Sequence, residues 1–301
     1  MYEQIAANKR KTALLVVGSI VFVVAVGWLI GYLFGIGPVG IVIALVVALV
    51  LSISSYFYGD KMVLASTRAR AVTKEEEPRL HNLVEGLAIA SGLPKPAVYV
   101  VPEQAPNAYA TGRNPEHSSI AVTQGLLSLM DRVELEGVIA HEMSHIQDRD
   151  ILLGTIVATL VGAAVLLSEF FMRSWWWGGF RGRRGGDSGG GAGELIVFIV
   201  GFALMALAPI AGQVIKLSVS RNREYLADAQ GALLTRYPPG LISALEKLKT
   251  APTAMSSANN ATGHLWLNQP SRIQGDGRST MERLFSTHPP LDERIRRLQE
   301  M

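Results

Sequence analysis

The sequence contains no cysteine. This absence excludes disulfide bonds, thiolate metal ligands and a cysteine nucleophile, and it is consistent with a reducing compartment. Charged residues are also scarce, at 18% of the 301 positions, whereas hydrophobic residues make up 49%. No basic run is interleaved with aromatic residues on a polar surface, so no nucleic acid is expected among the partners. The composition favours a membrane protein with one or two domains.

Two apolar runs near the start, residues 12–35 and 38–58, contain no charged side chain. Each run reaches the length of about 20 residues that a helix needs to cross the hydrocarbon core of a bilayer. A few uncharged residues around Gly35–Gly37 join the runs, and the first run is too long for a cleaved signal peptide. We therefore predict an amino-terminal transmembrane hairpin within residues 1–59, with the lipid bilayer as its partner.

The basic residues around this hairpin lie outside both apolar runs, and the turn between the runs has none. They are Lys9, Arg10 and Lys11 before the first run, and Lys61, Arg68, Arg70 and Lys74 after the second. Because cytoplasmic flanks are enriched in Lys and Arg, both ends of the hairpin are predicted to face the cytoplasm.

Residues 60–150 are polar enough for a soluble domain, and their patterns predict both helices and strands. The expected elements are a helix over 75–92 with acidic residues at its start, strands over 97–101, 107–111 and 118–123, a helix from Gln124, and one amphipathic helix over 131–150. We expect this segment to be the first part of the soluble domain.

Two further apolar runs, 151–172 and 194–217, are joined by a loop over 173–193 that is rich in glycine and arginine. Together they predict a second apolar helical pair over 151–217. The lengths of both runs favour crossing of the membrane, whereas the arginines oppose transfer of the loop to the outside. We favour crossing, which gives up to four transmembrane helices.

The remaining residues, 218–301, are predicted to form the second part of the soluble domain. Their patterns indicate helices over SRNREYLADAQGALL, from the prolines of YPPGLISALEKLKT, and from the prolines of THPPLDERIRRLQEM. The stretch 251–283 is rich in Ser, Asn, Gly and Thr, so a mobile loop is expected there.

Residues 141–145 read HEMSH and fall on the predicted helix over 131–150. Histidines four residues apart lie on one face of a helix, so His141 and His145 can bind one metal ion. Glu142 is rotated by about 100° from His141, where it can take a proton from a zinc-activated water and pass it to a departing amine. The pattern predicts one Zn²⁺ per chain, and a surface helix with two incidental histidines is the alternative.

A hydrolytic zinc site needs a third protein ligand and an open position for water. The stretch SRNREYLADAQ offers Glu224 as that ligand, and Asp228 follows one helical turn later on the same face. Asp228 is placed to accept a hydrogen bond from the outer ring nitrogen of a ligating histidine. Such acidic pairs also occur on many solvent-exposed helices, which is the alternative interpretation.

The stretch NAYATG, residues 107–112, is a candidate exposed sheet edge ahead of the helix with the histidines. A protease binds its peptide in extended form along such an edge, so Asn107, Ala108 and Tyr109 are candidate substrate-binding residues. An ordinary packed strand is the alternative.

Two further residues have candidate roles near the predicted site. His288, in FSTHPP, is a candidate for stabilising the transition-state oxyanion, with helix capping or packing as the alternative. Arg221, three residues before Glu224, is a candidate for bracing that carboxylate or a substrate carbonyl, and a solvated surface arginine is the alternative.

HEMSH, SRNREYLAD and THPPLDERIRRL together resemble the HtpX family of membrane-bound zinc metalloproteases, which is related to the CAAX prenyl endopeptidases. The amino-terminal apolar hairpin and NAYATG match that family as well. The resemblance implies an α+β, mainly α, integral membrane protein with a gluzincin-like zinc metalloprotease domain. It also implies zinc bound by His141, His145 and Glu224, with Glu142 as the general base.

The resemblance further implies a multi-pass endopeptidase of a bacterial or archaeal inner membrane, with its catalytic domain facing the cytoplasm. Its expected substrates are proteins and peptides, above all misfolded or damaged membrane proteins. Three alternatives are open. An intramembrane protease of the site-two type is disfavoured by the charged residues that flank HEMSH. A CAAX-type peptide-processing protease would have the same metal site, and a non-catalytic zinc-binding membrane protein or transporter is the third alternative.

The predicted crossing of residues 151–217 can be tested at Ser188, in the loop between the two apolar runs. Because the chain has no cysteine, Ser188→Cys introduces a single thiol. A membrane-impermeant thiol reagent is expected to label this variant on intact cells, since crossing places the loop outside. Labelling only after permeabilisation would show that the pair does not cross.

Overall fold

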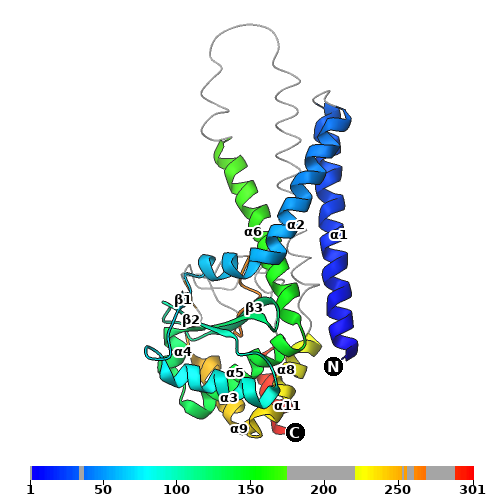
Figure 1. Ribbon diagram of the computed structural model, residues 1–301. Helices are drawn as coiled ribbons and strands as arrows, with labels where there is room; N and C mark the ends of the chain where they lie inside the picture. The colour runs from blue at the N-terminus through cyan, green and yellow to red at the C-terminus, as the bar shows by residue number, and fades with distance from the viewer. Residues whose placement is uncertain (1, 34–36, 175–220, 253, 256–260, 269–288) are drawn as a thin grey trace.

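The computed structural model describes residues 2–33, 37–174, 221–252, 254–255, 261–268 and 289–301. These residues form a mixed α/β body from which three long helices extend on one side: α1 (Tyr2–Leu33), α2 (Pro38–Ser66) and α6 (Asp150–Ser174) (Figure 1). The described part is mainly helical with one small sheet, as the sequence predicts. The predicted apolar run 194–217 and almost all of the loop before it lie outside the described residues.

α1 contains residues 12–33 of the first apolar run and α2 contains the whole second run, and both helices extend beyond the runs toward the body. Their backbones approach closely near the turn: a Cβ atom added at Gly31 would lie 2.9 Å from the Gly37 carbonyl oxygen and 3.2 Å from Gly40 Cα. Within the described part, α2 is the one helix long and apolar enough, by length and composition, to cross a membrane. That α1 also crosses stays a prediction.

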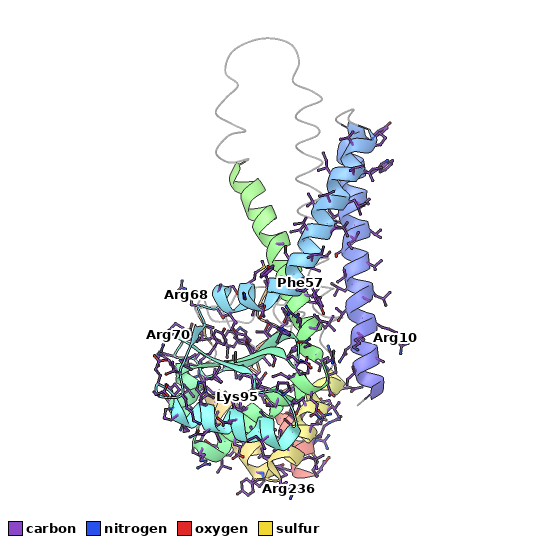
Figure 2. All side chains as sticks on the ribbon, in the orientation of Figure 1. Arg10, Phe57, Arg68, Arg70, Lys95 and Arg236 are labelled. Atoms are coloured by element: carbon purple, nitrogen blue, oxygen red, sulfur yellow. The ribbon has the colours of Figure 1, made fainter. Side chains whose placement is uncertain are left out.

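Basic side chains lie at the body end of the hairpin, as Figure 2 shows for Arg10, Arg68 and Arg70. The stretch of α2 farther from the body exposes large apolar side chains such as Val42 and Val46. A helix that enters a bilayer needs this separation, with an apolar surface along its length and basic residues at one interface.

The sheet has four strands in the order β1-β2-β4-β3 within the described part. β2 (Ala97–Val101) and β4 (His117–Thr123) are parallel, whereas β3 (Ala108–Asn114) is antiparallel to β4 and β1 (Arg70–Ala71) is antiparallel to β2. All three predicted strands are present, and β3 lies at an edge of the sheet. β1 is not predicted, because two exposed residues carry no alternating pattern that marks a strand.

The body also contains the predicted helices. They are α3 (Pro78–Ser91), α4 (Gln124–Leu129), α5 (Arg132–Gln147), α8 (Arg221–Thr235), α9 (Pro238–Thr250) and α11 (Leu291–Gln299). The acidic residues Glu75–Glu77 precede α3 instead of occupying its first turn. The reason is Pro78, which has no backbone N–H and is best tolerated at the first helical position.

α5 begins with a capping box, in which the Asp131 side chain accepts from the N–H of Glu134 and the Glu134 side chain accepts from the N–H of Asp131. The helix predicted over 131–150 ends earlier, at Gln147. Arg149 adopts a left-handed backbone conformation with φ 58°, and α6 then starts at Asp150. The chain therefore turns sharply between the helix that carries HEMSH and the apolar helix that follows.

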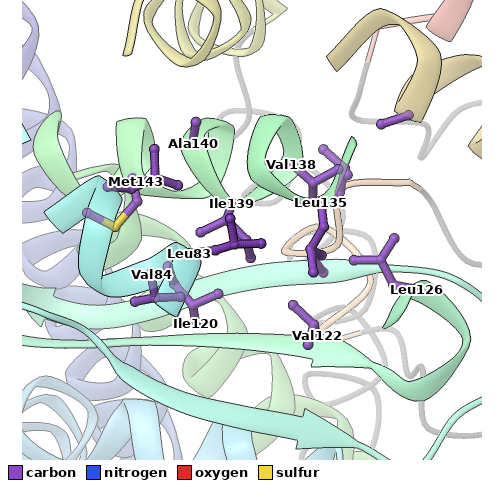
Figure 3. Packing of buried hydrophobic residues seen from close by; sticks show 14 of the residues in the cluster. Leu83, Val84, Ile120, Val122, Leu126, Leu135, Val138, Ile139, Ala140 and Met143 are labelled. Carbon is purple, nitrogen blue, oxygen red and sulfur yellow. The ribbon is translucent and has the colours of Figure 1, made fainter. Parts of the chain in front are cut away.

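α5 packs against the sheet, α3, α8 and α9. Its apolar side chains, including Ile139 and Met143, point toward Ile120 of β4 and Leu83 of α3 (Figure 3). Each fully buried side chain of this kind stabilises the fold by about 1.5–3 kcal/mol relative to exposure. The helix that carries HEMSH is consequently held in position from several sides.

Residues 261–268 are also described, and they correct the prediction of a mobile loop for this portion of 251–283. Trp266 is fully buried and packs edge-on against Tyr109 of β3, with ring centroids 4.7 Å apart. The Leu267 N–H donates a hydrogen bond to the Ala108 carbonyl, with an N···O distance of 2.9 Å. Composition misleads here because one large aromatic side chain can anchor a stretch of small and polar residues.

The close packing of α5 on α9 can be tested at Gly137. A Cβ atom added there would lie 2.8 Å from the backbone nitrogen of Leu241. We expect Gly137→Ala to lower the free energy of unfolding by about 1–3 kcal/mol, because one helix must shift. Gly86→Ala is the matched control, since a Cβ atom at this exposed helical position meets nothing within 4 Å. Thermal denaturation in detergent should separate the two variants, and equal melting temperatures would contradict the prediction.

Candidate metal centre

His141 and His145 lie one turn apart near the carboxyl end of α5 and turn their rings toward each other. Their Nε2 atoms are 3.2 Å apart. Glu224 of α8 completes the group, with Oε2 3.9 Å from His141 Nε2 and Oε1 3.7 Å from His145 Nε2. One potential ligand atom from each residue lies within 4.8 Å of the others.

This arrangement fits a zinc ion. Two nitrogens bound to tetrahedral zinc at about 2.0–2.1 Å lie roughly 3.3 Å apart, close to the separation of the two Nε2 atoms. Two histidines and one glutamate are also a donor set typical of hydrolytic zinc, with the fourth position left for water. Within the described part of the chain, this is the one group of three or more His, Asp or Glu side chains that could hold a metal ion.

A carboxylate lies behind each histidine. His141 Nδ1 donates to Asp228 Oδ1 at 2.9 Å, and His145 Nδ1 donates to Asp150 Oδ2 at 3.1 Å. A hydrogen bond at Nδ1 fixes the tautomer and leaves Nε2 as the metal ligand. The contact with Asp228 follows the sequence-based prediction. The contact with Asp150 was missed, because it depends on the tight turn at Arg149, where no glycine signals a left-handed residue.

Arg294 of α11 lies behind Asp228 and is also missed by the sequence analysis. Its Nε donates to Asp228 Oδ2 at 2.8 Å and its Nη2 to Asp228 Oδ1 at 2.6 Å, and the side chain is fully buried. Its Nη1 lies 3.8 Å from Glu224 Oε2. A signal exists in the sequence: Arg294 shares the apolar face of α11 with Ile295 and Leu298, where a charged residue needs a buried partner.

These contacts shift the pKa values of the ionisable side chains at the centre. Burial raises the pKa of Asp228, but the Arg294 ion pair outweighs burial and lowers that pKa to about 2. Burial and Arg294 lower the pKa of His141 to about 4. Burial also opposes the charged form of His145, yet the hydrogen bond to Asp150 and the charge of Glu224 raise its pKa to about 9. Because a ligating imidazole must be neutral, a metal at His145 Nε2 would compete with a proton for that atom.

A cavity adjoins the three candidate ligands. Glu142 of α5, Ala110 of β3 and Leu267 also line it. Glu142 is 2% exposed, so its carboxylate lies inside the protein next to the ligands and away from bulk solvent. A general base needs this location, because it must reach both an attacking water and the departing amine.

The candidate substrate-binding residues Asn107, Ala108 and Tyr109 are all buried. The Asn107 side chain donates to the Asn268 carbonyl at 2.6 Å and accepts from the Asn268 N–H at 2.9 Å. The Tyr109 hydroxyl lies 2.6 Å from Thr67 Oγ1. The side chains of this stretch therefore contact other parts of the protein, and the next residue of β3, Ala110, is the one that lines the cavity.

Of the other two candidates, Arg221 does not join the group. Arg221 is exposed at the first position of α8, in agreement with a solvated surface residue, and the arginine that approaches Glu224 is Arg294. Arg223 points inward instead, with Nη1 3.0 Å from Asp150 Oδ1. His288 lies outside the described residues.

Comparison with known proteins finds relatives that match this chain over its whole length. The profile of peptidase family M48 matches residues 74–301. "Protease HtpX homolog" of Thermoanaerobacter pseudethanolicus is 44% identical over 100% of this chain and 98% of its own length. The homologue from Lactobacillus helveticus is 40% identical over the full length of both chains. Among solved structures, S. mikatae Ste24p is similar with a TM-score of 0.48 and 20% identity, covering 99% of this chain and 67% of that one.

The family profile spans well over half of the chain, and the HtpX homologues match it from end to end. The donor set at the convergence of α5 and α8 is the one that a zinc metalloprotease requires. The chain therefore belongs to peptidase family M48, and within it to the HtpX group of membrane zinc metalloproteases.

Proposed function

We propose that His141, His145 and Glu224 bind the zinc ion of this metalloprotease and that Glu142 is its general base. The observation that carries this assignment is the convergence of two Nε2 atoms and one carboxylate at the cavity that Glu142 lines. His288 is proposed to stabilise the oxyanion, and Asn107–Tyr109 to support the strand along which an extended peptide binds.

The chemistry divides between the metal and the side chains. A bound zinc ion polarises the scissile carbonyl and makes an attacking water more acidic. Glu142 accepts the proton of that water and delivers it to the departing amine. Asp228 and Asp150 hold the two imidazoles with Nε2 facing the metal, and Arg294 keeps Asp228 ionised.

We further propose that the enzyme cleaves misfolded or damaged membrane proteins at the cytoplasmic face of an inner membrane. Two observations support this proposal. α6, whose apolar run begins at Ile151, starts five residues after His145, so the centre lies close to a segment suited to the bilayer. Basic residues such as Arg10 and Arg68 lie at the body end of the hairpin, which favours a cytoplasmic body.

In this proposal the chain is organised as a multi-pass enzyme. Residues 1–59 anchor it, 60–150 and 218–301 together form the gluzincin-like catalytic domain, and 151–217 form a second membrane pair. The supporting observation is that α5 from the first part and α8 and α11 from the second part meet at one centre.

The role of Glu142 can be tested by Glu142→Gln. We expect this variant to keep one zinc per chain and to lose casein cleavage by a factor of at least about 10²–10⁴, because the ligands remain while proton transfer is lost. Zinc is measured by elemental analysis of the detergent-purified protein. Glu136→Gln on the same helix is the control and should cleave normally. Cleavage by Glu142→Gln at the wild-type rate would exclude Glu142 as the base.

The third ligand can be tested by Glu224→Ala. A ligand set reduced to two histidines should bind zinc far more weakly, so the purified variant is expected to be both zinc-poor and inactive. Glu246→Ala, at an exposed position of α9, is the control for a lost carboxylate. Competition with a chromogenic chelator gives the affinity. If Glu224→Ala bound zinc as tightly as wild type, another residue would have to be the ligand.

A further inference from the structure

Asn8 connects the amino-terminal helix to the metal centre. It lies on α1, four residues before the first apolar run, and is 3% exposed although its neighbours Lys9 and Arg10 are exposed. Its side-chain amide donates to the Asp148 carbonyl at 3.1 Å and also to Asp150 Oδ1. A buried polar side chain of α1 thus makes hydrogen bonds to residues next to the HEMSH helix.

Asp150 carries this contact to a candidate zinc ligand. Its Oδ1 accepts from Asn8 and from Arg223 Nη1, the latter at 3.0 Å, while its Oδ2 accepts from His145 Nδ1 at 3.1 Å. Arg223 Nη1 also lies 3.4 Å from Asn8 Oδ1, which closes the group. With both donors on Oδ1, the carboxylate presents Oδ2 to His145.

Asp150 would be poorly fixed without these donors. It is the first residue of α6 and follows the left-handed turn at Arg149, so it has no preceding helical turn to restrict it. A donor from α1 and a donor from α8 together hold its carboxylate plane. The orientation of the His145 ring therefore depends in part on Asn8, which lies 137 positions earlier in the sequence.

We propose that Asn8 is a positioning residue of the metal centre: through Asp150 it orients His145, so the amino-terminal helix is part of the active site as well as a membrane anchor. This inference rests on the proposed role of His145 as a zinc ligand. Removing a partner that orients a ligating histidine typically costs about 10–100-fold in metal affinity. Asn8 acts one step farther out, so we expect on the order of a tenfold loss, the lower end of that range.

The test uses the full chain in detergent. Asn8→Ala removes the donor, and Asn8→Leu removes it with an uncharged side chain of similar size, which guards against a simple packing defect. Lys9→Ala, at the exposed neighbouring position, is the matched control. Zinc affinity is measured by chelator competition, and the visible spectrum of the Co²⁺-substituted protein reports the geometry of the ligands independently of activity.

A double-mutant cycle with Asp150→Ala separates positioning from general stabilisation. We expect both Asn8 variants to weaken zinc binding and to alter the Co²⁺ spectrum, Lys9→Ala to match wild type, and Asn8→Ala to add nothing in the Asp150→Ala background. Wild-type affinity and spectrum in Asn8→Leu, or additive losses in the double variant, would overturn the proposal. Full zinc binding by His145→Ala would instead overturn the ligand set, so the two failures are distinguishable.

Discussion

An ionised group buried in a protein interior costs several kcal/mol unless it has a partner, and this constraint determines how the metal centre is built. Each candidate histidine ligand is held by a carboxylate, and each of those carboxylates is held by an arginine. His141 contacts Asp228, which contacts Arg294. His145 contacts Asp150, which contacts Arg223. The centre thus contains two series of charge-assisted hydrogen bonds, and the histidine at the end of each series lines the cavity.

These two series of contacts also explain why distant segments meet. α5 supplies the histidines, α8 supplies Glu224 and Asp228, α11 supplies Arg294, and α6 begins at Asp150. Loss of α11 would leave Asp228 without Arg294, and loss of α6 would leave Arg223 without Asp150. The apolar packing of α5 against the sheet and α3 holds this helix in place, and the ionic contacts connect its histidines to α6, α8 and α11.

The spacing of residues within short segments was sufficient to predict the features that depend only on residues close together in the sequence. HEMSH falls on a helix, Glu224 and Asp228 lie on one face of another, and the three predicted strands are present. What was missed depends on contacts between distant residues: Asp150 on a turn at Arg149, and Arg294 on the apolar face of α11. Residues 261–268 were missed for the same reason, since Trp266 is anchored by Tyr109 and not by its own neighbours.

The ion pairs also determine the net charge of the metal centre. With neutral imidazoles, the formal charges at the centre are four carboxylates and two guanidinium groups, −4 + 2 = −2, from Glu142, Asp150, Glu224, Asp228, Arg223 and Arg294. The two arginines therefore offset half of the charge that these four carboxylates bring to the centre, and the negative charge that remains favours a bound cation.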